Sequence, residues 1–222
     1  ILVNYAKLQK LDGIDEIANA YISGEADFHA AVAKMAGIER SQAKTINLGL
    51  MYGMGKNKLM AELGLMKEAA EKLIAQYHVK APFIKQLMQA VSRRADESGR
   101  IRTLGGRVCH FDLWEPTTFG AGFPKTHAEA LKEYGPGIKR AGTYKALNRL
   151  IQGSAADMTK LSIIALSENG IIPHIQIHDE LDVSVEHSEQ AKQIVEIMES
   201  AIKLEIPNKV DYECGSNWGD IK

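Results

Sequence analysis

The chain has 222 residues, of which 45% are hydrophobic, 25% charged and 6% aromatic. This composition is typical of a folded globular protein and excludes disordered, collagen-like and coiled-coil proteins. The formal net charge of -1 excludes a strongly basic or acidic protein, so any surface for nucleic acid must be a local patch.

Amphipathic segments predict a helical first half. Apolar residues at spacings of three and four predict helices over 14–22, 27–37, 39–52, 67–77 and 82–98. Asp27 would cap the second of these helices, Gly37 would end it, and Gly99 would end the last one. Residues 100–111 carry Gly105-Gly106 between two short apolar or β-branched pieces, which predicts a small hairpin.

The second half mixes helices with short strands. Prolines, glycines and poor periodicity over 113–142 predict a loop insertion. A helix is predicted from about 143 to 168, and two β-rich runs, 172–177 and 181–185, flank an acidic turn. Ser188 would cap a last helix, and 210–212 would form a short strand. Helices followed by a hairpin with more helices predict an α+β fold.

Cysteine usage and hydropathy indicate a cytoplasmic protein. Cys109 and Cys214 stand far apart and outside any CxxC pair, which argues against a zinc site and against a disulfide scaffold. No run approaches the roughly 18 apolar residues that a membrane span needs. Residues 1–7 lack the order of a signal peptide, so we expect no membrane partner.

The most informative segment is RSQAKTINLGLMYG, at residues 40–53. At about 100° per residue, Arg40, Lys44, Leu48 and Tyr52 share one helix face roughly 120° wide. The two cations can bind the oxygens of a polyphosphate, while Leu48 and Tyr52 offer a flat surface for a sugar and a base. From spacing alone, a surface helix with solvated basic residues is the alternative. The glycines that follow lack two positions of the P-loop pattern, which excludes a P-loop.

A second segment, IHDEL at 177–181, places the adjacent carboxylates of Asp179 and Glu180 at a predicted hairpin turn. Two such groups on a rigid turn can hold Mg²⁺ through oxygen ligands. An ordinary polar turn is the alternative. His178 has no second histidine at metal-binding spacing, which weighs against a zinc hydrolase.

Further polar residues have spacings that suit a ligand. Asn148 and Gln152 stand at i and i+4 on a predicted helix and could direct both amides at the minor-groove acceptors of base pairs. His29 stands near the start of another predicted helix, where a phosphate could bind. Taken singly, ordinary surface amides and a partly buried histidine explain the same residues.

Taken together, these segments resemble the polymerase region of family A DNA polymerases, the DNA polymerase I class. The order DFHAAVA, RSQAKTINLGLMYG, LNRLIQGSAAD, IHDEL and GSNWGD carries this resemblance over nearly the whole chain and favours a bacteriophage member. RxxxKxxNxGxxYG resembles the family's motif B, and HDE resembles its motif C. The resemblance implies a partial right-hand polymerase, with helical fingers and an antiparallel-sheet palm. The implied parts are a palm helix at 1–13, fingers at 14–124, a loop insertion at 125–142 and palm at 143–222.

The resemblance also implies roles for individual residues. Arg40 and Lys44 would bind the triphosphate of the incoming deoxynucleoside triphosphate, with Lys44 protonating the leaving pyrophosphate, and His29 would add a phosphate contact. Leu48 stands beside the deoxyribose, where the family usually has Phe or Tyr, and Tyr52 would stack near the templating base.

Contacts with nucleic acid and metal are implied for the remaining residues. Asn148, Gln152 and His178 would touch primer-template DNA. Asp179 and Glu180 would serve two Mg²⁺ ions during attack of the primer 3′-hydroxyl on the α-phosphate.

The family's motif A, DxSQxExR, does not occur in the 222 residues, and residues 1–6 resemble the helix that follows it. We therefore expect a fingers and palm fragment that begins after motif A, with thumb and exonuclease upstream, and that is inactive alone. One half of a split polymerase and a non-catalytic nucleotide- or DNA-binding module are the alternatives. A palm sheet without its central strand would also expose strand edges, which could produce an artificial dimer.

Overall fold

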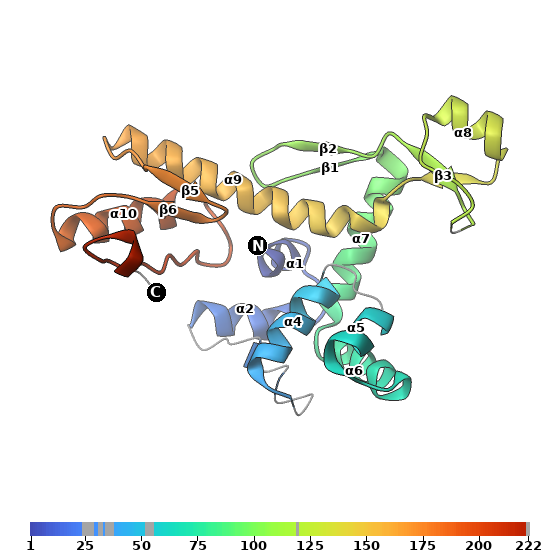
Figure 1. Ribbon diagram of the computed structural model, residues 1–222, viewed down its shortest axis with the longest axis horizontal. Helices are drawn as coiled ribbons and strands as arrows, with labels where there is room; N and C mark the ends of the chain where they lie inside the picture. The colour runs from blue at the N-terminus through green and yellow to red at the C-terminus, as the bar shows by residue number, and fades with distance from the viewer. Residues whose placement is uncertain (24–28, 31–32, 34–37, 52–55, 119, 221–222) are drawn as a thin grey trace. The chain divides into compact units, whose positions relative to one another are not determined.

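Helices form most of the first half of the computed structural model, which describes residues 1–23, 29–30, 33, 38–51, 56–118 and 120–220 (Figure 1). They are α1 (Leu2–Leu8), α2 (Ile14–Ile22), α4 (Arg40–Met51), α5 (Lys56–Leu63), α6 (Lys67–Lys80) and α7 (Pro82–Ser98). Within the described residues, α2, α4, α6 and α7 confirm predicted helices. The helix predicted over 27–37 falls mostly outside those residues. Helix α5 was not predicted, because its pattern is only eight residues long.

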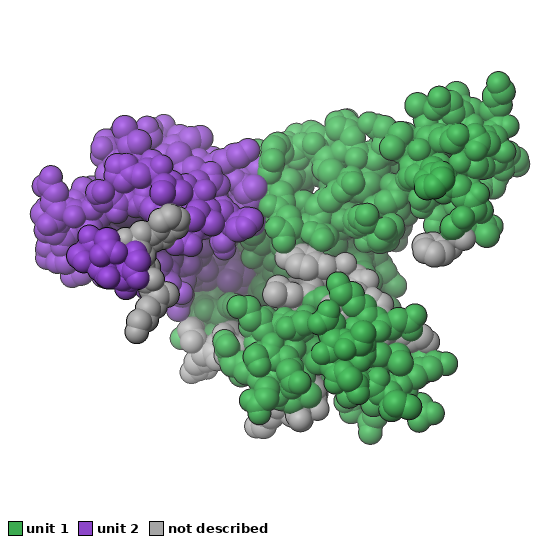
Figure 2. Space-filling view, viewed as in Figure 1, with its two compact units in different colours: residues 1–153 green, residues 154–222 purple. Residues whose placement is uncertain are grey.

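The chain divides into two units, Ile1–Gly153 and Ser154–Lys222 (Figure 2). Helix α7 is central to the core of the first unit. Pro82 stands in its first turn, and Gly99 ends it with φ of 68°, which is why the sequence predicted both ends. Its buried face includes Phe83, Leu87 and Val91. Around it lie two hydrophobic clusters, one with Ile46, Leu59 and Tyr77, the other with Phe111, Leu147 and Leu150.

Tyr77 and His78 bring polar groups into this core at the end of α6. Tyr77 is 1% exposed, and burial raises the pKa of its hydroxyl. Nδ1 of His78 is buried without a hydrogen-bond partner in the described structure. Burial, with a smaller contribution from the charge of Lys85, lowers the pKa of His78. Protonation of His78 is therefore disfavoured in the folded state.

The predicted hairpin after α7 is confirmed. Strand β1 (Arg100–Arg102) pairs antiparallel with β2 (Val108–His110), with Ile101 opposite Cys109. The hairpin packs on α9 (Ala146–Glu168) through a close contact at Gly153. Nη2 of Arg107 donates to the Gly153 carbonyl at 2.6 Å.

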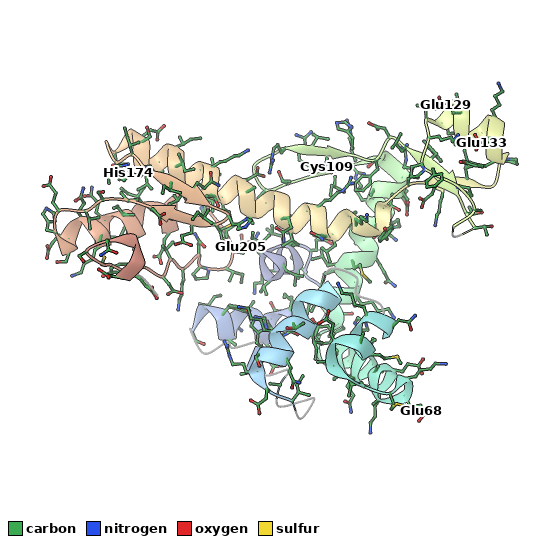
Figure 3. The ribbon with its side chains drawn as sticks, viewed as in Figure 1. Glu68, Cys109, Glu129, Glu133, His174 and Glu205 are labelled. Atoms are coloured by element: carbon green, nitrogen blue, oxygen red, sulfur yellow. The ribbon has the colours of Figure 1, made fainter. Side chains whose placement is uncertain are left out.

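The segment expected to be a loop insertion is not irregular. It contains β3 (Trp114–Pro116), α8 (His127–Tyr134) and β4 (Ile138–Arg140), with β3 and β4 paired antiparallel. A capping box between Thr126 and Glu129 starts α8, on which Glu129 and Glu133 are labelled in Figure 3. The prediction of a loop was wrong, because prolines and glycines at the strand ends concealed elements of eight residues or fewer.

Arg140 fastens this segment to the rest of the first unit. Its Nε donates to the Asp96 carbonyl and its Nη1 to the Phe111 carbonyl, each at 2.9 Å. The guanidinium also lies over the Trp114 ring, 4.8 Å from the ring centroid. A Cβ at Gly99 would lie 2.7 Å from Nη1 of Arg140, so this approach requires glycine.

A short 3₁₀ turn (Thr143–Lys145) leads into α9, and together they confirm the helix predicted over 143–168. In the second unit, β5 (Ile175–Ile177) and β6 (Glu180–Asp182) form the predicted hairpin with shorter strands. Helix α10 (Ser188–Ser200) and a 3₁₀ turn (Trp218–Asp220) follow. The mixture confirms the α+β prediction. A small core of Leu166, Ile171 and Ile194 holds α9, the hairpin and α10 together.

Two predictions for the second unit were wrong in detail. Helix α10 is capped by His187 and not by Ser188, since Nδ1 of His187 accepts from the Gln190 amide at 3.2 Å. Residues 210–212 form no strand, because the Val210 amide donates to Oε1 of Glu199 at 2.9 Å and not to a neighbouring strand.

Candidate nucleotide- and metal-binding residues

Helix α4 positions the predicted phosphate-binding cations. Ala43, Ile46 and Asn47 are at most 1% exposed and anchor the helix in the core. Arg40 and Lys44 lie one turn apart and are exposed. Because the buried residues fix the rotation of the helix, both cations are presented away from the core, as polyphosphate binding requires.

The apolar part of the predicted nucleotide surface is not described. Leu48 belongs to α4, but its side chain lies outside the described part of the structure, and so does all of Tyr52. Their stacking roles stay predictions.

His29 meets α4 through Asn47, a residue that sequence reasoning missed. Nδ2 of Asn47 lies 2.8 Å from Nδ1 of His29. With the amide nitrogen donating, Nδ1 of His29 is the acceptor, so the ring proton is on Nε2. Asn47 is 0% exposed and His29 is partly buried. The signal in the sequence was the polar amide of Asn47 on the buried side of an amphipathic helix. Burying an amide costs free energy unless it is hydrogen-bonded, so a partner was to be expected.

The predicted metal ligands lie at the turn between β5 and β6. Ile177 pairs with Glu180, which leaves His178 and Asp179 as the two turn residues. His178 has φ of 54°, an uncommon conformation for a residue other than glycine. Nε2 of Gln176 donates to the His178 carbonyl at 3.1 Å and supports this turn. The side chains of His178, Asp179 and Glu180 are exposed.

The donor set at this turn fits magnesium better than zinc. Among the described residues, no group of three or more His, Cys, Asp or Glu side chains could hold a metal ion. Two exposed, adjacent carboxylates suit Mg²⁺, which keeps several waters and shares protein carboxylates with substrate phosphates. Asp182 follows Glu180 on the same face of β6, a third acid that sequence reasoning did not single out.

The predicted DNA-contacting amides lie on α9. Asn148 is partly buried and Gln152 is exposed, one turn further along the helix. The structure therefore brings together His29 with α4, Asn148 with Gln152, and His178 with the two acids of the turn. No helix in the described ranges has the length and apolar character needed to cross a bilayer.

Comparisons with known proteins agree on one family. The family model described as DNA polymerase family A matches residues 8–220. A DNA-directed DNA polymerase of Pseudomonas phage M6 is 36% identical over 227 residues, which cover 87% of this chain and 31% of the relative. DNA polymerase I of Geobacillus stearothermophilus is 30% identical over 204 residues, which cover 88% of this chain and 21% of the relative. The chain thus spans less than a third of either relative.

A solved structure has the same fold. It is described as the POL domain of Pol1 from M. smegmatis in complex with DNA primer-template and dNTP, and it matches with a TM-score of 0.69 at 25% identity. The match covers 93% of this chain and 36% of the other.

Proposed function

We propose, because this chain belongs to DNA polymerase family A, that it serves template-directed DNA synthesis by nucleotidyl transfer to a primer 3′-hydroxyl. Its partners would be primer-template DNA and deoxynucleoside triphosphates. The observation that carries the proposal is the exposed pair Arg40 and Lys44 on a helix anchored in the core, with His29 joined to that helix through Asn47. In this proposal residues 14–124 act as fingers and 143–222 as palm.

The cations of α4 would bind the triphosphate. The planar fork of Arg40 suits bidentate binding of phosphate oxygens, and Lys44 can give a proton to the leaving pyrophosphate. With Nδ1 of His29 accepting from Asn47, the ring proton stands on Nε2, the nitrogen that would donate to a phosphate oxygen. Asn47 would therefore hold the tautomer that binding requires.

Contacts to the rest of the substrate would come from other segments. Leu48 and Tyr52 would lie against the sugar and the templating base. Asn148, Gln152 and His178 would contact primer and template through groups that every base pair offers.

Asp179 and Glu180 would hold Mg²⁺ through their carboxylate oxygens. The ion, when bound, supplies activation of the attacking hydroxyl and neutralises the charge that develops on pyrophosphate. The two residues are adjacent in sequence, Asp179 in the turn that Gln176 supports and Glu180 at the start of β6. That support would keep the carboxylate oxygens in place during the reaction.

Catalysis by these 222 residues alone would require a second metal-binding aspartate. The pattern DxSQxExR, which carries a second aspartate in the resembling family, does not occur in the sequence. Two-metal catalysis uses carboxylates from both motifs, so we infer that the chain binds nucleotide but does not extend a primer unaided.

Primer extension and nucleotide binding, measured in parallel, test both statements. We expect no extension of a primed template with Mg²⁺ and all four deoxynucleotides. We also expect binding of dATP that falls about tenfold or more in Lys44→Ala. Robust Mg²⁺-dependent extension by the pure chain would disprove the inactivity. Unchanged dATP binding by both Arg40→Ala and Lys44→Ala would disprove the proposed nucleotide site on α4.

The same assay separates the alternatives. One half of a split polymerase regains extension when a second polypeptide carrying DxSQxExR is added, and loses it again in Asp179→Ala. A non-catalytic binding module never extends, and Asp179→Ala leaves its binding of dATP and of primed DNA unchanged.

A further inference from the structure

A cavity of about 340 Å³ opens in the first unit, among residues to which the proposed function gives no role. Helices α1, α7 and α9 and the β1–β2 hairpin contribute its walls. Its lining includes the polar and charged residues Tyr5, Gln9, Arg94, Arg100 and Arg102. Its volume is within the range of about 300–1,000 Å³ that is usual for small-molecule sites.

Three arginines converge on this cavity from two elements. Arg100 and Arg102 stand two residues apart on β1, so strand alternation places both on one face, about 7 Å apart along the strand. Arg94 comes from α7, one turn after Val91, which also lines the cavity. All three are exposed. Three like charges around one hollow repel one another, so an anion bound there would relieve an unfavourable arrangement.

The rest of the lining is apolar and aromatic, without an acid. None of the described residues that line the cavity is Asp or Glu. Ala90, Val91 and Leu150 supply aliphatic surface, and Val91 and Leu150 belong to the buried core, so they provide a fixed floor. Tyr5 and Gln9, one turn apart at the end of α1, add a ring and an amide.

One arginine is already held in place. Nη1 of Arg102 donates to the Gly106 carbonyl at 2.8 Å, a contact inside the β1–β2 hairpin. Across the strand pair, Arg102 faces Val108, which also lines the cavity. A guanidinium ordered before the ligand arrives loses less conformational entropy on binding.

We propose that this cavity binds a nucleoside phosphate, either a free nucleotide or the terminal nucleotide of a strand. Arg94, Arg100 and Arg102 would take the phosphate, since the guanidinium fork matches phosphate oxygens in pairs. The Tyr5 ring and the aliphatic floor would take the base, and the Gln9 amide its polar edge. The cavity shares no lining residue with the sites proposed at Arg40 and Lys44 and at the acidic turn. It therefore goes beyond the proposed function.

Calorimetric titration with dAMP tests the site. The protein titrated is Arg40→Ala/Lys44→Ala, so that the triphosphate-binding cations of α4 do not contribute. Adding Arg94→Glu and Arg100→Glu is expected to weaken dAMP binding about a hundredfold, because two charge-assisted contacts become repulsive. Arg93→Glu is the matched control. It makes one such charge reversal, one residue away from Arg94 on α7, at an exposed position that does not line the cavity. It should leave affinity within about twofold.

Three further arms define the ligand. Arg94→Lys/Arg100→Lys keeps the charge and loses the paired geometry, and an intermediate loss is expected. A 5′-phosphorylated oligothymidylate that binds more tightly than dAMP identifies a strand end as the source, and the reverse order identifies a free nucleotide. Inorganic phosphate that binds as tightly as dAMP would overturn the nucleoside part of the proposal. Unchanged dAMP binding in Arg94→Glu/Arg100→Glu, or an equal loss in Arg93→Glu, would overturn the site.

These outcomes are distinguishable from failure of the proposed function. Loss of dATP binding on mutation of Arg40 and Lys44 concerns α4 alone. Because the variants change exposed side chains, circular dichroism of each is expected to match the parent, and a variant that differs is replaced by its Lys counterpart.

Discussion

The contact between Gly153 of α9 and Thr103 of the β1–β2 hairpin allows a quantitative test of the packing that places Gln152. A Cβ at position 153 would lie 2.8 Å from Cγ2 of Thr103. Thr103 is 8% exposed, and its Oγ1 donates to the Arg107 carbonyl at 3.3 Å. Rotating Cγ2 away would break that bond. Gly153→Ala therefore creates a steric overlap with Thr103 that neither α9 nor the hairpin can relieve without a cost in free energy.

Two opposing contributions determine the effect of Gly153→Ala on the free energy of unfolding. Overpacking a buried site costs about 1–3 kcal/mol. Alanine inside a helix is favoured over glycine by about 1 kcal/mol. The net expectation is a loss of stability of about 1 kcal/mol, with the overlap exceeding the helix contribution. In a Thr103→Ser background Cγ2 is absent while the hydroxyl remains, so the same mutation should stabilise by about 1 kcal/mol.

Equilibrium urea unfolding of the four proteins, followed by far-ultraviolet circular dichroism, measures this coupling. The predicted change of sign between the two backgrounds corresponds to a coupling energy of about 2 kcal/mol. This is well above the deviation from additivity that mutations at independent sites show. Additive effects of Gly153→Ala and Thr103→Ser would refute the assigned contact. A stabilising Gly153→Ala in the parent would show that the hairpin can move away from α9 at little cost.

Three further predictions concern stability and nucleotide binding. Gly99→Ala should cost more stability in thermal unfolding than Gly170→Ala, because both have positive φ (68° and 75°) but only Gly99 has a side chain close to the missing Cβ; equal losses would contradict this. Since folding lowers the pKa of His78, the unfolded state binds more protons than the folded state below about pH 6.5. The free energy of unfolding should therefore decrease as the pH is lowered through that range. His78→Gln should flatten the dependence of the urea midpoint on pH. Asn47→Leu should weaken dATP binding several-fold, and adding His29→Ala should cause little further loss, because the first mutation already removes the hydrogen bond that sets the tautomer of the His29 ring.

Local signals made several features of the fold predictable. Helix α7 was bounded correctly because proline and glycine mark its two ends chemically. The turn at Asp179 was predicted because two β-rich runs flank the three polar residues His178, Asp179 and Glu180. The loop prediction over 113–142 failed for the opposite reason. Trp114 is held by the Arg140 guanidinium, and no local pattern of residues reveals a contact across that separation.

The site shows the same division between local and long-range information. Helical spacing alone put Arg40 and Lys44 on one face. It gave no indication that Asn47, on the buried side, meets His29, because the two residues belong to different segments. The roles of the site residues, the boundaries of fingers and palm and the artificial dimer stay predictions.

The turn that carries Asp179 and Glu180 belongs, in the described part of the second unit, to a sheet of only two strands. An isolated two-stranded hairpin is at best marginally stable in water. Here Leu181 of β6 packs against a core of Leu166, Ile171 and Ile194, contributed by α9, the segment after it and α10. The position of Asp179 and Glu180 therefore depends on apolar contacts one strand residue away. Leu181→Ala should weaken Mg²⁺ binding at the turn although it removes no metal ligand, whereas Ile175→Ala, at a residue 43% exposed on the partner strand, should not.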